Sequence, residues 1–193
     1  MDEKNELATI ESIDYEWNVN YFHVEISIQH APSQPMNEEQ HGLTFVPYTP
    51  AHRQAFFDLN AAWLNAYFLL EPFDIEVLSD PEKMVIDPGG AIYVGLLEGE
   101  AIATFALTPQ GEGKVELNKM AVDEEHRGKG FGHQMMEYIL NVCRQREVHT
   151  LELYSHTSLK PAIHLYETYG FKPVPVPIDC VYDRADIRMQ MTL

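Results

Sequence analysis

The sequence contains little cysteine, and the cysteine it has follows no known pattern. Its 193 residues include two cysteines, Cys143 and Cys180, with no C-x-x-C spacing. This excludes a disulfide-rich scaffold and a zinc site built from several cysteines. The nine histidines are dispersed along the chain, so no metal site is expected from them either.

Long apolar runs and a secretory leader are also missing. No stretch approaches the roughly 18 consecutive apolar residues of a membrane-spanning helix. The N-terminus is acidic and lacks a basic region followed by an apolar segment, which is the mark of a secretory signal. We therefore expect a cytoplasmic protein without a membrane partner.

Basic residues are scarce. The chain carries 13 Lys and Arg against 30 Asp and Glu, a formal net charge of −17. Nucleic acids and anionic membranes require a broad basic face, so neither is expected as a partner. The acidity is uneven: residues 1–41 hold nine acids and one base, whereas residues 114–160 hold seven of each. A site for an anionic ligand is therefore expected within 114–160.

The length is typical of one domain with an appendage. Residues 1–41 are interpreted as an acidic N-terminal extension, and residues 42–193 as the main domain. Within the extension, residues 22–28 alternate apolar and polar side chains, which predicts a half-buried strand. That strand could extend the sheet, pair with a second subunit or form an accessory arm, so a homodimer is left open.

The main domain shows a regular succession of strand and helix patterns. Residues 71–89, rich in proline and acids, are expected to be irregular. Periodicity predicts helices over 51–70, 130–146 and 161–169, and strands over 43–48, 91–97, 101–107, 115–122, 149–154, 171–176 and 187–193. This order predicts a mixed α/β sheet with at least one crossover connection.

The sharpest feature is a glycine loop, Arg127-Gly-Lys-Gly-Phe-Gly132, between a strand and a helix. Glycines let the backbone approach a ligand closely, and the start of a helix presents unpaired N–H groups and a positive dipole end. Together they predict a pyrophosphate cradle, to which Arg127 and Lys129 add charge-assisted contacts. The spacing is neither that of a P-loop nor GxGxxG. The alternative is a glycine-rich turn with two incidental bases.

Two motifs in this sequence resemble those of the GCN5-related N-acetyltransferase (GNAT) superfamily. Arg127, Gly130 and Gly132 match its Arg/Gln-x-x-Gly-x-Gly/Ala signature. Residues 161–171 resemble its Ala-x-x-Leu-Tyr-x-x-x-Gly-Phe, through Ala162, Leu165, Tyr166, Gly170 and Phe171. Residues 181–188 resemble the Tyr-x-Arg-Ala-x-x-x-Met ending of some small bacterial members, which names no acceptor. The resemblance covers about residues 43–193.

The resemblance implies a fold and a cofactor. The fold is α/β (α+β), with a mixed, mostly antiparallel sheet, a V-shaped splay between strands 4 and 5, and helices on both faces. Acetyl-CoA would lie in the splay. Its pantetheine arm would pair with the backbone groups of Met120 and Val122, and its pyrophosphate would bind the glycine loop. The loop after the fifth strand lacks the asparagine of many relatives, and Ser158 or Thr157 would replace it. The implied cofactor-binding residues are Met120, Ala121, Val122, Arg127, Gly128, Lys129, Gly130, Phe131, Gly132 and Ser158.

The same resemblance assigns chemical roles. Tyr166 occupies the general-acid position, where a phenol faces the CoA sulfur; the alternative is a tyrosine packed on a short helix. Glu116 occupies a position where relatives often carry the base, which would accept a proton through a water; the alternative is an ordinary polar strand residue. Asn118 would share the face of Glu116 and orient that water, provided that the strand has no bulge between them.

Two further residues are weaker candidates for binding the acceptor. His156 lies near the expected site, where it could also act as a base, although a solvated role is the alternative. Glu71 follows the first helix, where an acid would suit a cationic amine, although a solvated loop is the alternative.

The sequence thus predicts an acetyl-CoA-dependent N-acetyltransferase that acts on the primary amine of a small molecule or amino acid by direct attack. One alternative is a non-catalytic acyl-CoA-binding regulatory module of the same fold. The other is a peptide or protein N-acetyltransferase.

Overall fold

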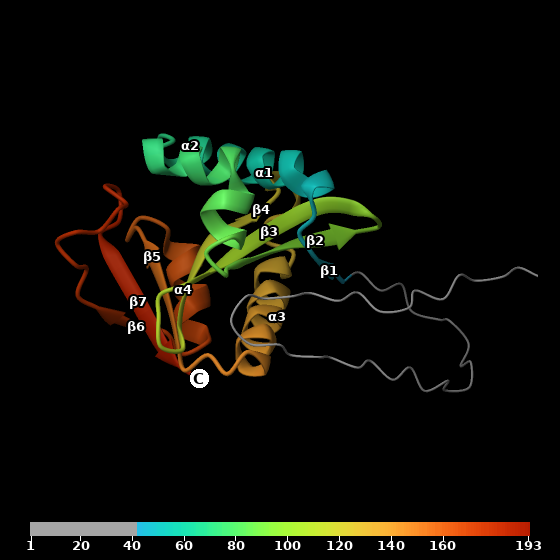
Figure 1. Cartoon of the computed structure of the whole chain (residues 1–193). Coiled ribbons are helices and arrows are strands. Elements are labelled where there is room, and N and C mark those ends of the chain that lie inside the picture. Colours follow the sequence, from blue (N-terminus) through green and yellow to red (C-terminus); the bar gives the residue numbers. More distant parts are fainter. Residues whose placement is uncertain (1–41) are drawn as a thin grey trace, which may run out of the picture. The chain divides into compact units, whose positions relative to one another are not determined.

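The computed structural model of the protein describes residues 42–193, so the strand predicted at 22–28 lies outside the described residues. The strands are β1 (Thr44–Pro47), β2 (Ala91–Leu97), β3 (Glu100–Pro109), β4 (Lys114–Val122), β5 (Thr150–Ser155), β6 (Lys172–Val174) and β7 (Ile187–Thr192). The helices are α1 (Arg53–Tyr67), α2 (Pro72–Ser79), α3 (Phe131–Gln145) and α4 (Lys160–Thr168), with short helical turns η1 (Pro50–His52), η2 (Glu82–Ile86) and η3 (Glu124–His126). Figure 1 shows their arrangement.

The strands form one mixed sheet in the order β1-β2-β3-β4-β5-β7-β6. Every neighbouring pair is antiparallel except β4 and β5, which run parallel. The parallel pairing covers three positions and ends at Glu116 opposite Glu152, although both strands continue beyond it. The predicted splay between the fourth and fifth strands is thus confirmed. The opening between β4 and β5 begins at Glu116 and Glu152, and we call it the fork.

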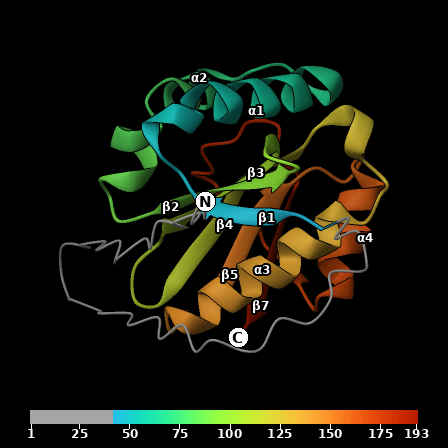
Figure 2. The same cartoon turned by 90° about the vertical axis from the view of Figure 1, so that its right-hand side faces the viewer.

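Helices cover both faces of the sheet, as predicted (Figure 2). Alternate residues of a strand point to opposite faces, so Ile92 packs with α1 and α2 on one face, while the neighbouring Tyr93 packs with α3 on the other. Each face therefore has its own apolar core.

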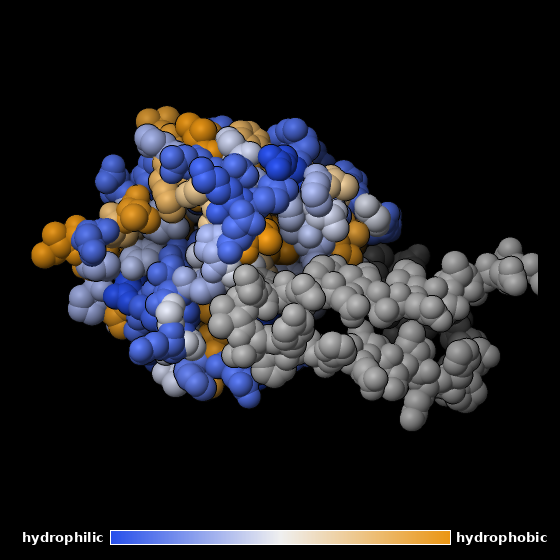
Figure 3. Space-filling view, in the orientation of Figure 1, coloured by the Kyte–Doolittle hydropathy of each residue, from blue (hydrophilic) through white to orange (hydrophobic). Residues whose placement is uncertain are grey.

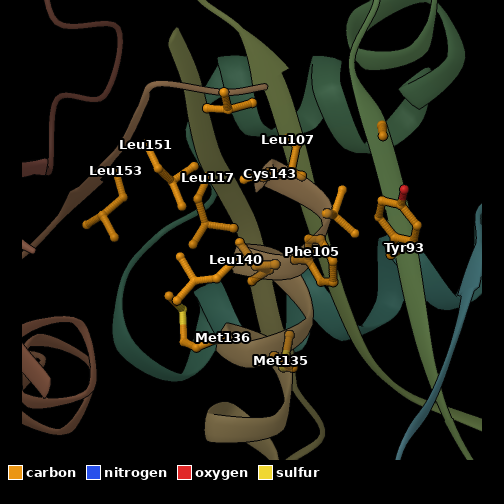
Figure 4. Close-up of a cluster of buried hydrophobic side chains, with 14 of the residues drawn as sticks. Tyr93, Phe105, Leu107, Leu117, Met135, Met136, Leu140, Cys143, Leu151 and Leu153 are labelled. Atoms are coloured by element: carbon orange, nitrogen blue, oxygen red, sulfur yellow. The ribbon is translucent and has the colours of Figure 1, made fainter. Parts of the chain in front are cut away.

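The larger core is built around α3 (Figure 4). Apolar residues recur on one side of this helix at helical spacing, and Met135, Met136, Ile139 and Cys143 are fully buried against the sheet. Cys143 is therefore part of the core, and burial raises the pKa of its thiol to about 11.

The segment 71–89, expected to be irregular, instead contains α2 and η2. The prediction was wrong because it took proline as a helix breaker. Pro72 stands in the first turn of α2, where its missing N–H is not needed. The backbone N–H of Glu71 donates to Oδ2 of Asp74 (3.2 Å) and caps the helix start.

Among residues 42–193, no helix combines the length and apolarity needed to cross a membrane.

Candidate active site

A β-bulge in β4 shapes the region beyond the fork. Ala106 pairs with Asn118, but Thr104 pairs with Ala121, so one residue of β3 faces two of β4. Lys119 stands at the bulge in the left-handed region, with φ of +49°. Bulges redirect side chains and bend a strand. Because this one falls after residue 118, Asn118 keeps the same face as Glu116.

The glycine loop before α3 has the conformation of an anion cradle. Gly128 and Gly130 have φ of +76° and +86°, and a Cβ on either would meet no atom within 4 Å. Within the described part of the chain, the N–H groups of residues 128–132 have no hydrogen-bond acceptor. Free N–H groups around open space at a helix start fit the pyrophosphate of acetyl-CoA.

Arg127 stabilises this loop through two contacts of its side chain. Its Nε donates to the carbonyl oxygen of Val122 (3.0 Å), and its guanidinium lies 5.7 Å from the ring centre of Tyr67. Lys129 is exposed, whereas Phe131 is buried and anchors the start of α3. The loop therefore offers a ligand mainly its main chain.

A pocket occupies the opening between β4 and β5. It is lined by β4 from Glu116 to Met120, by β5 from Leu153 to Ser155, and by Tyr166 of α4. The Tyr166 hydroxyl has no hydrogen-bond partner among residues 42–193. Burial raises its pKa to about 12, so this phenol stays protonated at neutral pH.

Glu116 is buried at the base of the fork, with 6% of its surface exposed. Its carboxylate accepts hydrogen bonds from Tyr182 Oη (2.8 Å), Gln110 Nε2 (3.1 Å) and Asn118 Nδ2 (3.3 Å). All three donors are neutral. Burial raises the pKa of Glu116, although the bonds from Tyr182 and Asn118 oppose this shift.

The other two buried carboxylates of the described chain are paired with cations. Glu152 contacts Arg188 and Lys114; although burial opposes it, these partners and Gln190 lower its pKa. Asp74 is likewise held by two cations. No cation of residues 42–193 lies within salt-bridge distance of Glu116, which makes it the carboxylate best able to take up a proton.

A second cluster lines the same pocket. Asp74 is fully buried and contacts Lys119 Nζ (2.7 Å) and Arg184 Nη1 (2.6 Å). Arg184 Nη1 also lies 2.8 Å from Glu71 Oε2. Burial opposes it, but Arg184 and Lys119 lower the pKa of Asp74. Glu71, whose position in the sequence suggested a contact with a cationic amine, is paired in this structure with a cation of the chain itself.

His156 and Ser158 bind each other at the rim of the pocket. The Ser158 N–H donates to Nδ1 of His156 (3.1 Å), which places the ring proton on Nε2, 3.6 Å from Asp186 Oδ2. Both ring nitrogens of His156 therefore face groups of the chain itself. The Thr157 N–H and hydroxyl both donate to Asp186, and Ser158 Oγ lies 2.7 Å from His156 Nδ1, so both hydroxyls of this loop are already hydrogen-bonded within the chain.

Sequence reasoning missed four residues that contact the site: Gln110, Lys119, Tyr182 and Arg184. Tyr182 and Arg184 stand two apart in the segment between β6 and β7, and both side chains point inward, whereas Val181 and Asp183 are exposed. The Tyr-x-Arg pattern was the available signal, but nothing local indicated what these side chains would contact.

Comparisons with known proteins agree with this geometry. Residues 53–171 match the model of the "Acetyltransferase (GNAT) family". An N-acetylaspartate synthetase from Xenopus tropicalis is 34% identical over 102 residues, which are 51% of this chain and 37% of that protein. The chain thus spans well under half the length of that relative.

Solved structures share the fold. A GNAT-family acetyltransferase from Staphylococcus aureus superposes with a TM-score of 0.70 at 14% identity, over 78% of this chain and 99% of the other. A Bacillus subtilis acetyltransferase in complex with CoA gives 0.61 at 18% identity, over 78% and 99%. With the matched family model, the splayed sheet and the glycine cradle, these findings establish that the chain belongs to the acetyltransferase (GNAT) family.

Proposed function

We propose that the protein transfers the acetyl group of acetyl-CoA to a primary amine by direct attack. The observation that carries the proposal is the environment of the Glu116 carboxylate. It is a buried carboxylate held by neutral donors, with a raised pKa, in the wall of the pocket that also contains the free hydroxyl of Tyr166.

The residues that would hold acetyl-CoA run from the fork to the start of α3. The main chain of Met120 and Val122 would contact the pantetheine, Ser158 would contact it from the opposite loop, and the N–H groups of residues 128–132 would hold the pyrophosphate. The open space above Gly128 and Gly130 supports this assignment. When bound, acetyl-CoA supplies the activated acetyl thioester.

The chain's own groups would then move two protons. Glu116 would accept a proton from the attacking amine through a water that Asn118 orients, and its raised pKa suits a base working near neutral pH. Tyr166 would give its Oη proton to the departing sulfur. The N–H of Met120 or Ala121 would stabilise negative charge on the acetyl oxygen.

The acceptor is a separate question. The Xenopus relative is named for aspartate, which keeps amino acids among the candidate acceptors. A module that only binds acyl-CoA has no need for a buried carboxylate with a raised pKa beside the fork, and we therefore favour a catalytic role.

The test is release of CoA thiol on mixing the protein with acetyl-CoA and a panel of primary amines. We expect amine-dependent release, which Glu116→Gln and Tyr166→Phe should each lower by about 100-fold, without loss of CoA binding. Glu100→Gln, which neutralises an exposed carboxylate at the start of β3, is the matched control and should behave as wild type. CoA binding without amine-dependent release would favour the regulatory module instead.

A further inference from the structure

Glu116 stands between two pockets. The first is the pocket of the fork, and the second, of about 320 Å³, lies on the other side of a wall that the two pockets share. The wall consists of Glu116, Asn118, Tyr154 and Tyr182. An acceptor held in the second pocket can attack a thioester in the first only if its amine passes through this wall beside Glu116.

Polar groups such as Gln110 and Asp179 line one part of the second pocket, and apolar side chains line the other. The apolar side chains come from α2, η2 and the segment between β6 and β7, namely from Phe73, Val77, Met84, Val85, Pro177 and Val181. Hydrophobic side chains gather at the surface of the same β6–β7 segment, at the left of Figure 3. Such side chains favour an apolar ligand body, because its burial removes apolar surface from water.

Asn118, in the shared wall, carries an unsatisfied acceptor. Asn118 Nδ2 donates to Thr108 Oγ1 (3.0 Å) and to Glu116 Oε1 (3.3 Å), which fixes the orientation of the amide. Its Oδ1 is buried and has no donor among the described residues. An unmet buried acceptor is costly, and an N–H of a ligand would satisfy it once a side chain of the wall moves to admit the ligand, because Oδ1 is closed off in this structure.

The charges of the second pocket disfavour an anionic ligand. Its lining contains two carboxylates, Glu116 and Asp179, and no Lys, Arg or His. The cations Lys119 and Arg184 line the first pocket and are held by Asp74. A ligand carboxylate in the second pocket would therefore be desolvated without a cationic partner.

We infer that the second pocket binds the acceptor, and that the acceptor is a primary amine on an apolar body without a carboxylate. This inference rests on the proposed function and narrows it. The amine would extend past Asn118 and Glu116 into the first pocket, where it can reach the thioester, and the apolar body would lie between Phe73, Val85 and Val181.

The first experiment compares matched acceptors, each amino acid against the amine that lacks its carboxylate: leucine against 3-methylbutylamine, and phenylalanine against 2-phenylethylamine. We expect kcat/KM at least tenfold higher for each amine. The α-amine of an amino acid is less basic and more often neutral, so this chemical bias works against the expected result. Equal or better turnover of the amino acids would overturn the inference and leave the proposed function intact. No turnover of any acceptor would overturn both.

The second experiment places a cation in the pocket wall. Val181 is 57% exposed and lines the pocket, whereas Ile178 is fully exposed on the same segment and does not. We expect Val181→Lys to lower kcat/KM for the amines at least tenfold and to reduce their advantage over the amino acids. Ile178→Lys, with the same added charge, should leave both values unchanged. Identical behaviour of the two variants would contradict the assignment of this pocket.

Discussion

The phenolic oxygen of Tyr182 lies 2.8 Å from Oε1 of Glu116, although 66 residues separate them in the sequence. Tyr182 is buried, and two cations lie near its ring: Lys119 Nζ and Arg184 Cζ are each 5.5 Å from the ring centre. Burial and the neighbouring Glu116 raise the pKa of Tyr182 well above its ordinary value. Tyr182 is therefore a constant hydrogen-bond donor, and the β6–β7 segment positions the carboxylate of β4.

This contact predicts the effect of Tyr182→Phe on the pH profile. The hydrogen bond from Tyr182 opposes the rise in the pKa of Glu116, so its loss should raise that pKa further. We expect the acidic limb of the kcat/KM profile to move to higher pH, with a stability loss of about 1 kcal/mol. Tyr67→Phe, which removes the hydroxyl of an exposed tyrosine on α1, is the control. An unmoved acidic limb would show that Tyr182 does not position the base.

The raised pKa of Glu116 predicts how the stability of the protein depends on pH, and Glu116→Gln tests that prediction. A carboxyl whose pKa is raised by folding holds its proton more tightly in the native state than in the unfolded state. The wild type should therefore lose stability, relative to the variant, as pH rises from the unfolded pKa through the raised native pKa. Denaturant titrations of both proteins between pH 4 and 8 measure this difference. A difference that is flat with pH would mean that the pKa of Glu116 is not raised.

Gly130→Val should abolish CoA binding without unfolding the domain. A branched side chain is strained at φ of +86° and would fill the space above the loop. Gly99→Val is a matched control, because Gly99 also has φ of +86° and open space around its Cβ position, but lies in the β2–β3 turn. Calorimetric titration with CoA should show binding to the Gly99 variant alone. Tight binding to the Gly130 variant would remove the cradle assignment.

Arg184→Ala should destabilise the protein by about 3 kcal/mol, because it leaves the buried carboxylate of Asp74 with one cation instead of two. Arg53→Ala breaks the exposed pair with Glu82 and should change stability far less. Denaturant unfolding at neutral pH measures both. Similar losses in the two variants would contradict a structural role for the buried cluster.

The sequence by itself determined the parts of the site that are local. The glycine loop could be recognised in the sequence because the positive φ angles of Gly128 and Gly130 and the free N–H groups of residues 128–132 arise within one short stretch of chain. Glu116 and Asn118 could be placed on one face because the period of a strand is two residues. The periodicity of 130–146 likewise determined α3 and its buried side.

Only the tertiary structure decided which acidic side chain of the site is left without a cationic partner. Nothing near Asp74 in the sequence shows that Lys119 and Arg184 neutralise it, and nothing near Glu116 shows that it meets only neutral donors. Burial and pairing depend on side chains brought together from distant elements, and these set the pKa of a carboxylate. Sequence could therefore name the acids of the site, but only their packing could tell which one is left to take up a proton.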